Sequence, residues 1–245
     1  TSQISPSLTS NSPPPSCVAP LVVGVDAVQP SSSLAYYQGR IWCWIDNVLS
    51  YAAQEELTAG IPEECFPSGL NGNFFRLQDQ GTNLLATNSA LYSWSEEQTY
   101  ILTGSTKETF NIAPLYDNFG AAKNQHRAVA RYGSNVVFLT QDFRLAVIRD
   151  PSAKQPDVIS DPLYTDLRDI LQSNDNVFFD IEYWADLEKE WLVLAACVPD
   201  NVANSRVYVY DIKKSNLKQV NFWNTPWSVP LTALVSGLVP SPPSE

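Results

Sequence analysis

Short runs of alternating apolar and polar residues, separated by tight-turn signals, recur along most of the chain. The clearest example lies near the start, where three runs and two turns follow one another as 34–37, Gln38-Gly39, 40–45, Asp46-Asn47 and 48–52. Two-residue connections rich in Gly, Asn and Asp join antiparallel strands. The stretch therefore predicts a three-stranded antiparallel meander.

Further strands are expected on both sides of this meander. Residues 17–28 are typical of an edge strand interrupted by Pro20. Residues 90–104 predict a hairpin that turns at Glu96-Glu97. The remaining strand or strand–turn–strand segments are 73–77, 109–115, 128–149, 177–198 and 206–212.

The strand–turn–strand unit begins near residues 35, 90, 128 and 177. These intervals of roughly 40–55 residues are typical of the four-stranded blades of a β-propeller. We therefore predict an all-β fold, a β-propeller-like array of short antiparallel meanders, incomplete or with few blades. A β-sandwich, which also has short strands, is the alternative.

One amphipathic helix is expected to interrupt the strands, over 162–172. Its apolar residues Leu163, Leu167, Ile170 and Leu171 recur at helical spacing and form one stripe. The chain holds 18 Pro and only 10 Gly, so long helices are disfavoured elsewhere. Three regions follow: a Ser/Thr/Pro-rich arm with an edge strand (1–33), a propeller-like domain (34–236) and a Pro/Ser-rich tail (237–245).

Residues 1–16 contain no charged residue and too little apolar surface to fold alone. They are interpreted either as a disordered leader or as an extended arm along a neighbouring subunit. The aromatic group Tyr36, Tyr37, Trp42 and Trp44 also has two interpretations, core or exposed stacking platform, and alternation across strands favours the core. The residues expected to be buried are Trp42, Trp44, Val137, Phe138, Trp191, Leu192 and Val193.

The net charge of −11 disfavours non-specific binding to phosphate backbones. Basic residues such as Arg127, Arg131 and Lys213-Lys214 are scattered rather than gathered in a stripe. Cys43 and Cys197 lie in apolar runs, where a thiol behaves as a small hydrophobic group. No apolar run reaches the length of about 18 residues that a membrane-spanning helix needs.

The search for catalytic chemistry yields no catalytic, cofactor-binding or metal-binding residues. His126 is the single histidine, so any Ser-His-Asp or Cys-His arrangement would require it, and its polar neighbours favour a surface or interface role. The acidic pairs are expected in solvated turns, although two carboxylates from separate blades would suit a glycosidase; they are Glu55-Glu56, Glu63-Glu64 and Glu96-Glu97. The Asn174–Asn176 segment carries oxygen ligands but lacks the spacing of a calcium loop, which favours a turn.

Several segments resemble the β-propeller tail-hub and nozzle proteins of short-tailed bacteriophages, including the packaged-DNA stabilisation type. They lie between Leu34 and Trp227 and read "YYQGRIWCW", "NVLSYA", "WSEEQTYILTGS", "GAAKNQHRAVARYGSNVVFLTQDFRLAVI" and "RVYVYDIKKSNLKQVNFW". The chain is shorter than is usual in that family, which implies fewer blades or a propeller completed by a neighbour.

The resemblance implies a structural protein of the virion tail and not an enzyme. Such proteins form homo-oligomeric rings below the portal and adaptor, extend the DNA exit channel and contact tail fibre or needle proteins. It implies passive contact with DNA, no cofactor and no membrane association. The alternatives are a carbohydrate-binding or glycoside-hydrolase-like propeller and a generic secreted scaffold domain.

Overall fold

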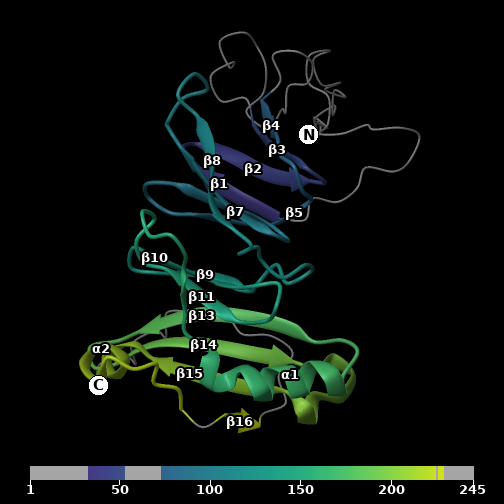
Figure 1. Cartoon of the computed structure of the whole chain (residues 1–245), viewed down its shortest axis with the longest axis vertical. Coiled ribbons are helices and arrows are strands. Elements are labelled where there is room, and N and C mark those ends of the chain that lie inside the picture. The colour runs from purple at the N-terminus through teal and green to yellow at the C-terminus, as the bar shows by residue number, and fades with distance from the viewer. Residues whose placement is uncertain (1–32, 53–72, 225, 229–245) are drawn as a thin grey trace, which may run out of the picture.

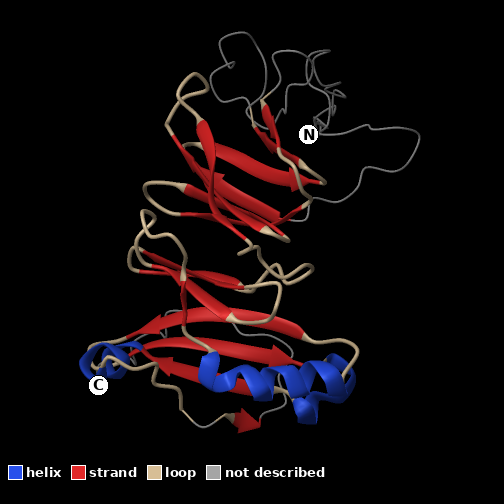
Figure 2. Ribbon diagram, in the orientation of Figure 1, coloured by secondary structure: helices blue, strands red, loops and turns tan. Residues whose placement is uncertain are grey.

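The computed structural model describes residues 33–52, 73–224 and 226–228. Four successive parts of the chain each form a separate four-stranded antiparallel sheet, with the strands in chain order (Figures 1 and 2). We number these sheets 1 to 4. The strands of sheets 1 and 2 are β1 (Ser33–Tyr37), β2 (Arg40–Ile45), β3 (Val48–Tyr51), β4 (Phe74–Arg76), β5 (Gly81–Ala86), β6 (Leu91–Ser95), β7 (Gln98–Thr103) and β8 (Asn111–Asp117).

Sheets 3 and 4 repeat the same meander topology. Their strands are β9 (Val129–Tyr132), β10 (Asn135–Leu139), β11 (Leu145–Ile148), β12 (Asp157–Val158), β13 (Phe178–Ala185), β14 (Glu190–Cys197), β15 (Arg206–Asp211) and β16 (Trp227–Ser228). The four sheets begin at residues 33, 81, 129 and 178, so their starts are 48, 48 and 49 residues apart. The repeat is therefore more regular than the sequence pattern suggested.

The sequence placed the start of the second repeat near residue 90, which is wrong because β5 was missed. The segment Gly81–Ala86 has no alternation of apolar and polar residues, and it begins with a glycine, which is depleted in strands. It nevertheless pairs with β6 from Gly81 to Ala86. The 128–149 segment was likewise expected to hold two strands, and it holds β9, β10 and β11 because residues 140–144 form a second turn.

The expected all-β, β-propeller-like array of antiparallel meanders is confirmed, and the four separate sheets replace the β-sandwich alternative. The sheets follow one another along the longest axis of the molecule, with sheet 1 and sheet 4 at opposite ends (Figure 1). One hydrophobic cluster fills each of the three interfaces between successive sheets, and we call each of these interfaces a step. The described array is thus open, with two end faces.

Between sheets 1 and 2 the cluster is aromatic. Trp42 stacks on Tyr51 at 4.5 Å between ring centroids, and Phe110 meets both rings edge-on at 5.1 and 5.2 Å. Trp44 is fully buried beside Gly81, where a Cβ atom would lie 1.9 Å from the indole Cδ2. The core interpretation therefore holds for Tyr37, Trp42 and Trp44.

The step between sheets 2 and 3 is also rich in aromatic side chains. Trp94 and Phe138 meet between sheets 2 and 3 at 5.3 Å between ring centroids. The cluster between sheets 3 and 4 is mainly aliphatic, and it includes Leu167 and Ile170. Both belong to α1 (Tyr164–Ser173), which follows a 3-10 helix at Asp161–Leu163 and confirms the helix expected over 162–172.

A second helix, α2 (Ile212–Lys218), follows β15 and was not expected from the sequence. It begins because the Asp211 carboxylate accepts a hydrogen bond from the Lys214 backbone N–H, a standard N-cap. Another 3-10 segment lies at Pro199–Asn204. No helix in the described part of the chain is long and apolar enough to cross a membrane.

Two members of the expected core are only partly buried, Trp191 and Val193, because they lie on the end face of sheet 4. Tyr36 is 69% exposed on the opposite end face, so it does not join the core with Tyr37. The expected edge strand at 17–28, the arm at 1–16 and the tail at 237–245 lie outside the described residues.

Candidate functional site

The first strand of each sheet lies at the sheet edge, and first strands of neighbouring sheets contact one another. β1 contacts β5, β5 contacts β9, and β9 contacts β13. In a β-propeller the first strands line the central axis. This row of strands is therefore where a channel or ligand surface would form, and its polar side chains define the candidate site.

Gln125, in the connection before β9, ties three sheets together near this row. Its side-chain amide donates to the Val177 carbonyl at 2.9 Å, and its side-chain oxygen accepts from the Phe179 backbone N–H at 2.7 Å. Its backbone carbonyl accepts a hydrogen bond from the Asn83 side chain of β5 at 3.0 Å. Because Gln125 is buried, these bonds fix the relative positions of sheets 2, 3 and 4 without competition from water.

A surface depression of about 410 Å³ lies between β9 and β13. Arg127 lines it and forms ion pairs with Asp180 at 3.0 Å and with Glu182 at 3.8 Å. Arg131 also lines it and donates to the Asn88 side chain at 3.2 Å. The guanidinium groups of this depression are thus engaged with protein oxygens, which weakens their attraction for phosphate.

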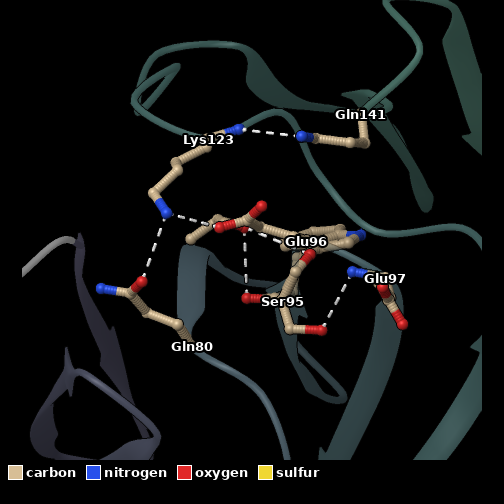
Figure 3. Close-up of polar contacts among 8 residues, drawn as sticks. Gln80, Ser95, Glu96, Glu97, Lys123 and Gln141 are labelled. Atoms are coloured by element: carbon tan, nitrogen blue, oxygen red, sulfur yellow. Dashed lines mark hydrogen bonds and ion pairs between the residues drawn. The ribbon is translucent and has the colours of Figure 1, made fainter.

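A second polar cluster lies where the hairpin turns of sheets 2 and 3 meet (Figure 3). Lys123 forms an ion pair with Glu96 at 2.7 Å and also reaches the Gln80 side-chain oxygen at 3.4 Å. The Lys123 backbone N–H donates to Gln141 at 3.3 Å. Glu96 therefore lies in an exposed turn, as expected, where it forms an ion pair between neighbouring segments.

His126 is exposed and lines a depression of about 280 Å³ together with Phe178 and Cys197. The structure thus brings the single histidine near a thiol, although the two are 71 positions apart in the sequence, which no local motif signals. Burial raises the pKa of Cys197, and the charge of Asp180 raises it further. The thiol therefore stays protonated at neutral pH, which is unfavourable for nucleophilic catalysis.

Asn174 and Asn176 make structural hydrogen bonds. The Asn174 amide donates to the Ile170 carbonyl at the end of α1, and the Asn176 amide donates to Asp200 at 2.7 Å. Within the described residues no group of three or more His, Cys, Asp and Glu side chains is arranged to hold a metal ion. The pairs Glu55-Glu56 and Glu63-Glu64 lie outside those residues.

Cys43 and Cys197 are both free and buried, as their apolar surroundings predicted. Burial raises the pKa of Cys43 to about 11. Sequence reasoning missed Gln125, because a buried glutamine in a polar connection has no distinguishing pattern. It also missed the exposed apolar residues of the end strands, because a nearly continuous apolar run, as in β2, predicts a strand that is buried on both faces.

No protein-family model and no curated protein matches the chain. Among solved structures, the chain is similar to a quinonprotein alcohol dehydrogenase-like protein from Bacteroides thetaiotaomicron, with a TM-score of 0.40 and 14% identity. The alignment covers 74% of this chain and 43% of that protein, so the chain spans less than half of its length. A likeness at this level carries no inference about activity.

Proposed function

We propose that this chain is a structural subunit of the tail of a short-tailed bacteriophage, of the hub or nozzle type. The observation that carries the proposal is the open array, whose two end sheets lie far apart and expose apolar side chains such as Tyr36 and Phe178. A self-contained propeller would bury both end faces against each other. An open array is instead suited to completion by neighbouring subunits in a larger assembly.

The charge distribution supports a passive role beside DNA. The chain carries a net charge of −11, and several arginines are paired with carboxylates: Arg127 with Asp180, Arg144 with Asp142 and Arg149 with Asp157. Tight non-specific binding to duplex DNA needs several lysines or arginines that can release counterions from phosphates. A wall of this kind would let DNA pass without retaining it.

Two measurements test this function. Antibodies raised against the chain should label purified virions at the tail, and virions that lack the protein would contradict the proposal. In addition, a labelled DNA duplex titrated with the purified chain should show no submicromolar binding at about 0.15 M salt. Tight binding that persists at that salt concentration would contradict the passive channel.

A carbohydrate-binding propeller is the second candidate, favoured by the ring pair Trp184–Trp191. Their centroids are 5.1 Å apart, and Trp184 is 36% exposed. Exposed indole rings are suited to stacking on apolar sugar faces. Quenching of tryptophan fluorescence by a soluble oligosaccharide, lost in Trp184→Ala, would support this candidate over the structural one.

A further inference from the structure

A polar groove lies where the connection between β11 and β12 meets α2 and the residues that follow this helix. Two adjoining depressions of about 360 and 330 Å³ form the groove, and they share Arg149 and Asn221. Each volume is in the range of small-molecule sites. The amide and charged side chains of the lining are Arg149, Gln155, Asp157, Asn216, Gln219 and Asn221.

Hydrogen bonds join the two walls of this groove. The Asn221 side-chain amide donates to the Val158 carbonyl of β12 at 3.5 Å, and it accepts from the Tyr210 hydroxyl at 3.2 Å through its oxygen. The Trp223 indole N–H donates to the Ile159 carbonyl at 2.8 Å. The groove is therefore formed before a ligand binds, which lowers the entropic cost of binding. These side chains also occupy carbonyls at the edge of sheet 3, where they would compete with an added peptide strand.

The lining of the groove carries no net charge. Its two charged side chains, Arg149 and Asp157, form an ion pair at 3.0 Å. A phosphate-rich ligand therefore finds no uncompensated positive charge among these residues, and the net charge of −11 on the whole chain opposes a polyanion. The ligand that suits this lining is neutral and polar.

Three amide side chains of the lining are available to a ligand. Gln155, Asn216 and Gln219 are exposed, and in the described part of the chain their side chains make no hydrogen bond. Each amide offers two donors and one acceptor oxygen, so it can bind neighbouring hydroxyl groups of a sugar ring. The half-buried Phe119 and the 56% exposed Val220 supply apolar surface for the C–H groups of the same ring.

One buried polar group close to the groove lacks a protein partner. The hydroxyl of Tyr132 is buried and makes no hydrogen bond to the described residues. Burial raises its pKa, and three residues of the groove lining, Arg149, Tyr210 and Asp157, are close enough to act on it. A buried hydroxyl without a partner is destabilising unless water or a ligand reaches it. The surroundings of Arg149 are therefore suited to a ligand that carries hydroxyl groups.

We propose that this groove binds a neutral saccharide, through hydrogen bonds between its amide side chains and the ring hydroxyls. The inference goes beyond the proposed structural role and does not rest on it. It also assigns saccharide binding to a place other than the Trp184–Trp191 pair, because neither of these residues lines the groove.

Calorimetric titration of the purified full chain with neutral oligosaccharides of glucan, mannan, galactan and chitin tests the groove. We expect at least one of them to bind with a Kd of about 1 mM or tighter. Gln155→Ala and Asn216→Ala each remove one available amide, one from each wall, and each should weaken binding by about 2–10-fold. Gln78→Ala is the matched control, because this exposed glutamine between β4 and β5 lies outside the groove, so the affinity should not change.

Three results would overturn the proposal. The first is that none of the four classes of oligosaccharide binds. The second is binding that survives the combined Gln155→Ala and Asn216→Ala variant or is lost in Trp184→Ala, because the sugar would then lie elsewhere. The third is that tryptic peptides of casein bind in place of the sugars and are weakened by the same substitutions, which would assign the groove to a peptide. Far-ultraviolet circular dichroism confirms that each variant is folded.

Discussion

The step between sheets 1 and 2 and the step between sheets 3 and 4 have the same topology but different cores. The first is held by stacked rings, with Trp42, Tyr51 and Phe110 in contact and Trp44 pressed against Gly81. The second is mainly aliphatic and is extended by α1. The local meander specifies each sheet, whereas the side chains on the faces of the sheet determine how it packs against the next one.

Trp44→Ala tests the aromatic step and should have the largest effect. Removing a fully buried indole should lower the free energy of unfolding by about 3–5 kcal/mol. Denaturant titration followed by circular dichroism measures the loss, with Leu217→Ala as an exposed control. Unfolding indistinguishable from wild type would contradict the aromatic core.

A double-mutant cycle that combines Trp44→Ala with Gly81→Ala tests the contact between these two residues directly. The added methyl group would collide with the Trp44 ring, so alone it should cost about 1–3 kcal/mol. In the Trp44→Ala background the collision is absent and the cost should nearly disappear. Equal costs in both backgrounds would show that the glycine does not serve this contact.

Gln125→Leu tests the side-chain link between the connection before β9 and sheet 4, because the bond from Asn83 goes to the Gln125 backbone carbonyl and stays in place. It leaves the Val177 carbonyl and the Phe179 N–H without their partners, which should cost about 2–4 kcal/mol. The neighbouring substitution His126→Ala, at an exposed position, should stay within about 0.5 kcal/mol of wild type. Thermal unfolding of the two variants gives the comparison, and similar melting temperatures would refute the link.

Tyr132 lies in the cluster between sheets 3 and 4, and it should make the stability of the fold sensitive to alkali. Burial raises the pKa of its hydroxyl to about 12, above its ordinary value of 10.0. The folded state therefore holds the hydroxyl proton more tightly than the unfolded state does. The contribution of this group to the free energy of unfolding is complete below pH 10 and decreases by about 1.4 kcal/mol per pH unit between pH 10 and 12. Tyr132→Phe should match wild type at pH 8 and unfold less readily than wild type at pH 12; equal losses in alkali would exclude this residue as the cause.

Lys123→Ala should have the smallest effect. The Lys123–Glu96 ion pair is exposed, with 49% and 32% of the side-chain surfaces accessible. Exposed pairs of this kind contribute about 0–1 kcal/mol and are screened by salt. Chemical denaturation at low and at high salt measures the difference, and a loss above about 2 kcal/mol would show that this cluster is structural rather than a surface contact.

The sequence predicted most strands because their alternation and turn chemistry are local. Gln38 and Gly39 both adopt positive φ in the two-residue turn between β1 and β2, as that turn requires. The sequence analysis missed β5 because this strand forms through its pairing with β6. It missed α2 because a single capping carboxylate, that of Asp211, starts this helix. The site around Gln125 and the end faces could not be predicted, since both depend on which sheets become neighbours.

Imaging the purified assembly by electron cryomicroscopy tests the central claim most directly. The account predicts an assembly of several copies, with the four-sheet array open within each copy. A single copy in which its own β1 and β13 lie side by side would be a closed propeller. That result would contradict the open array and the role in an assembly that is proposed from it.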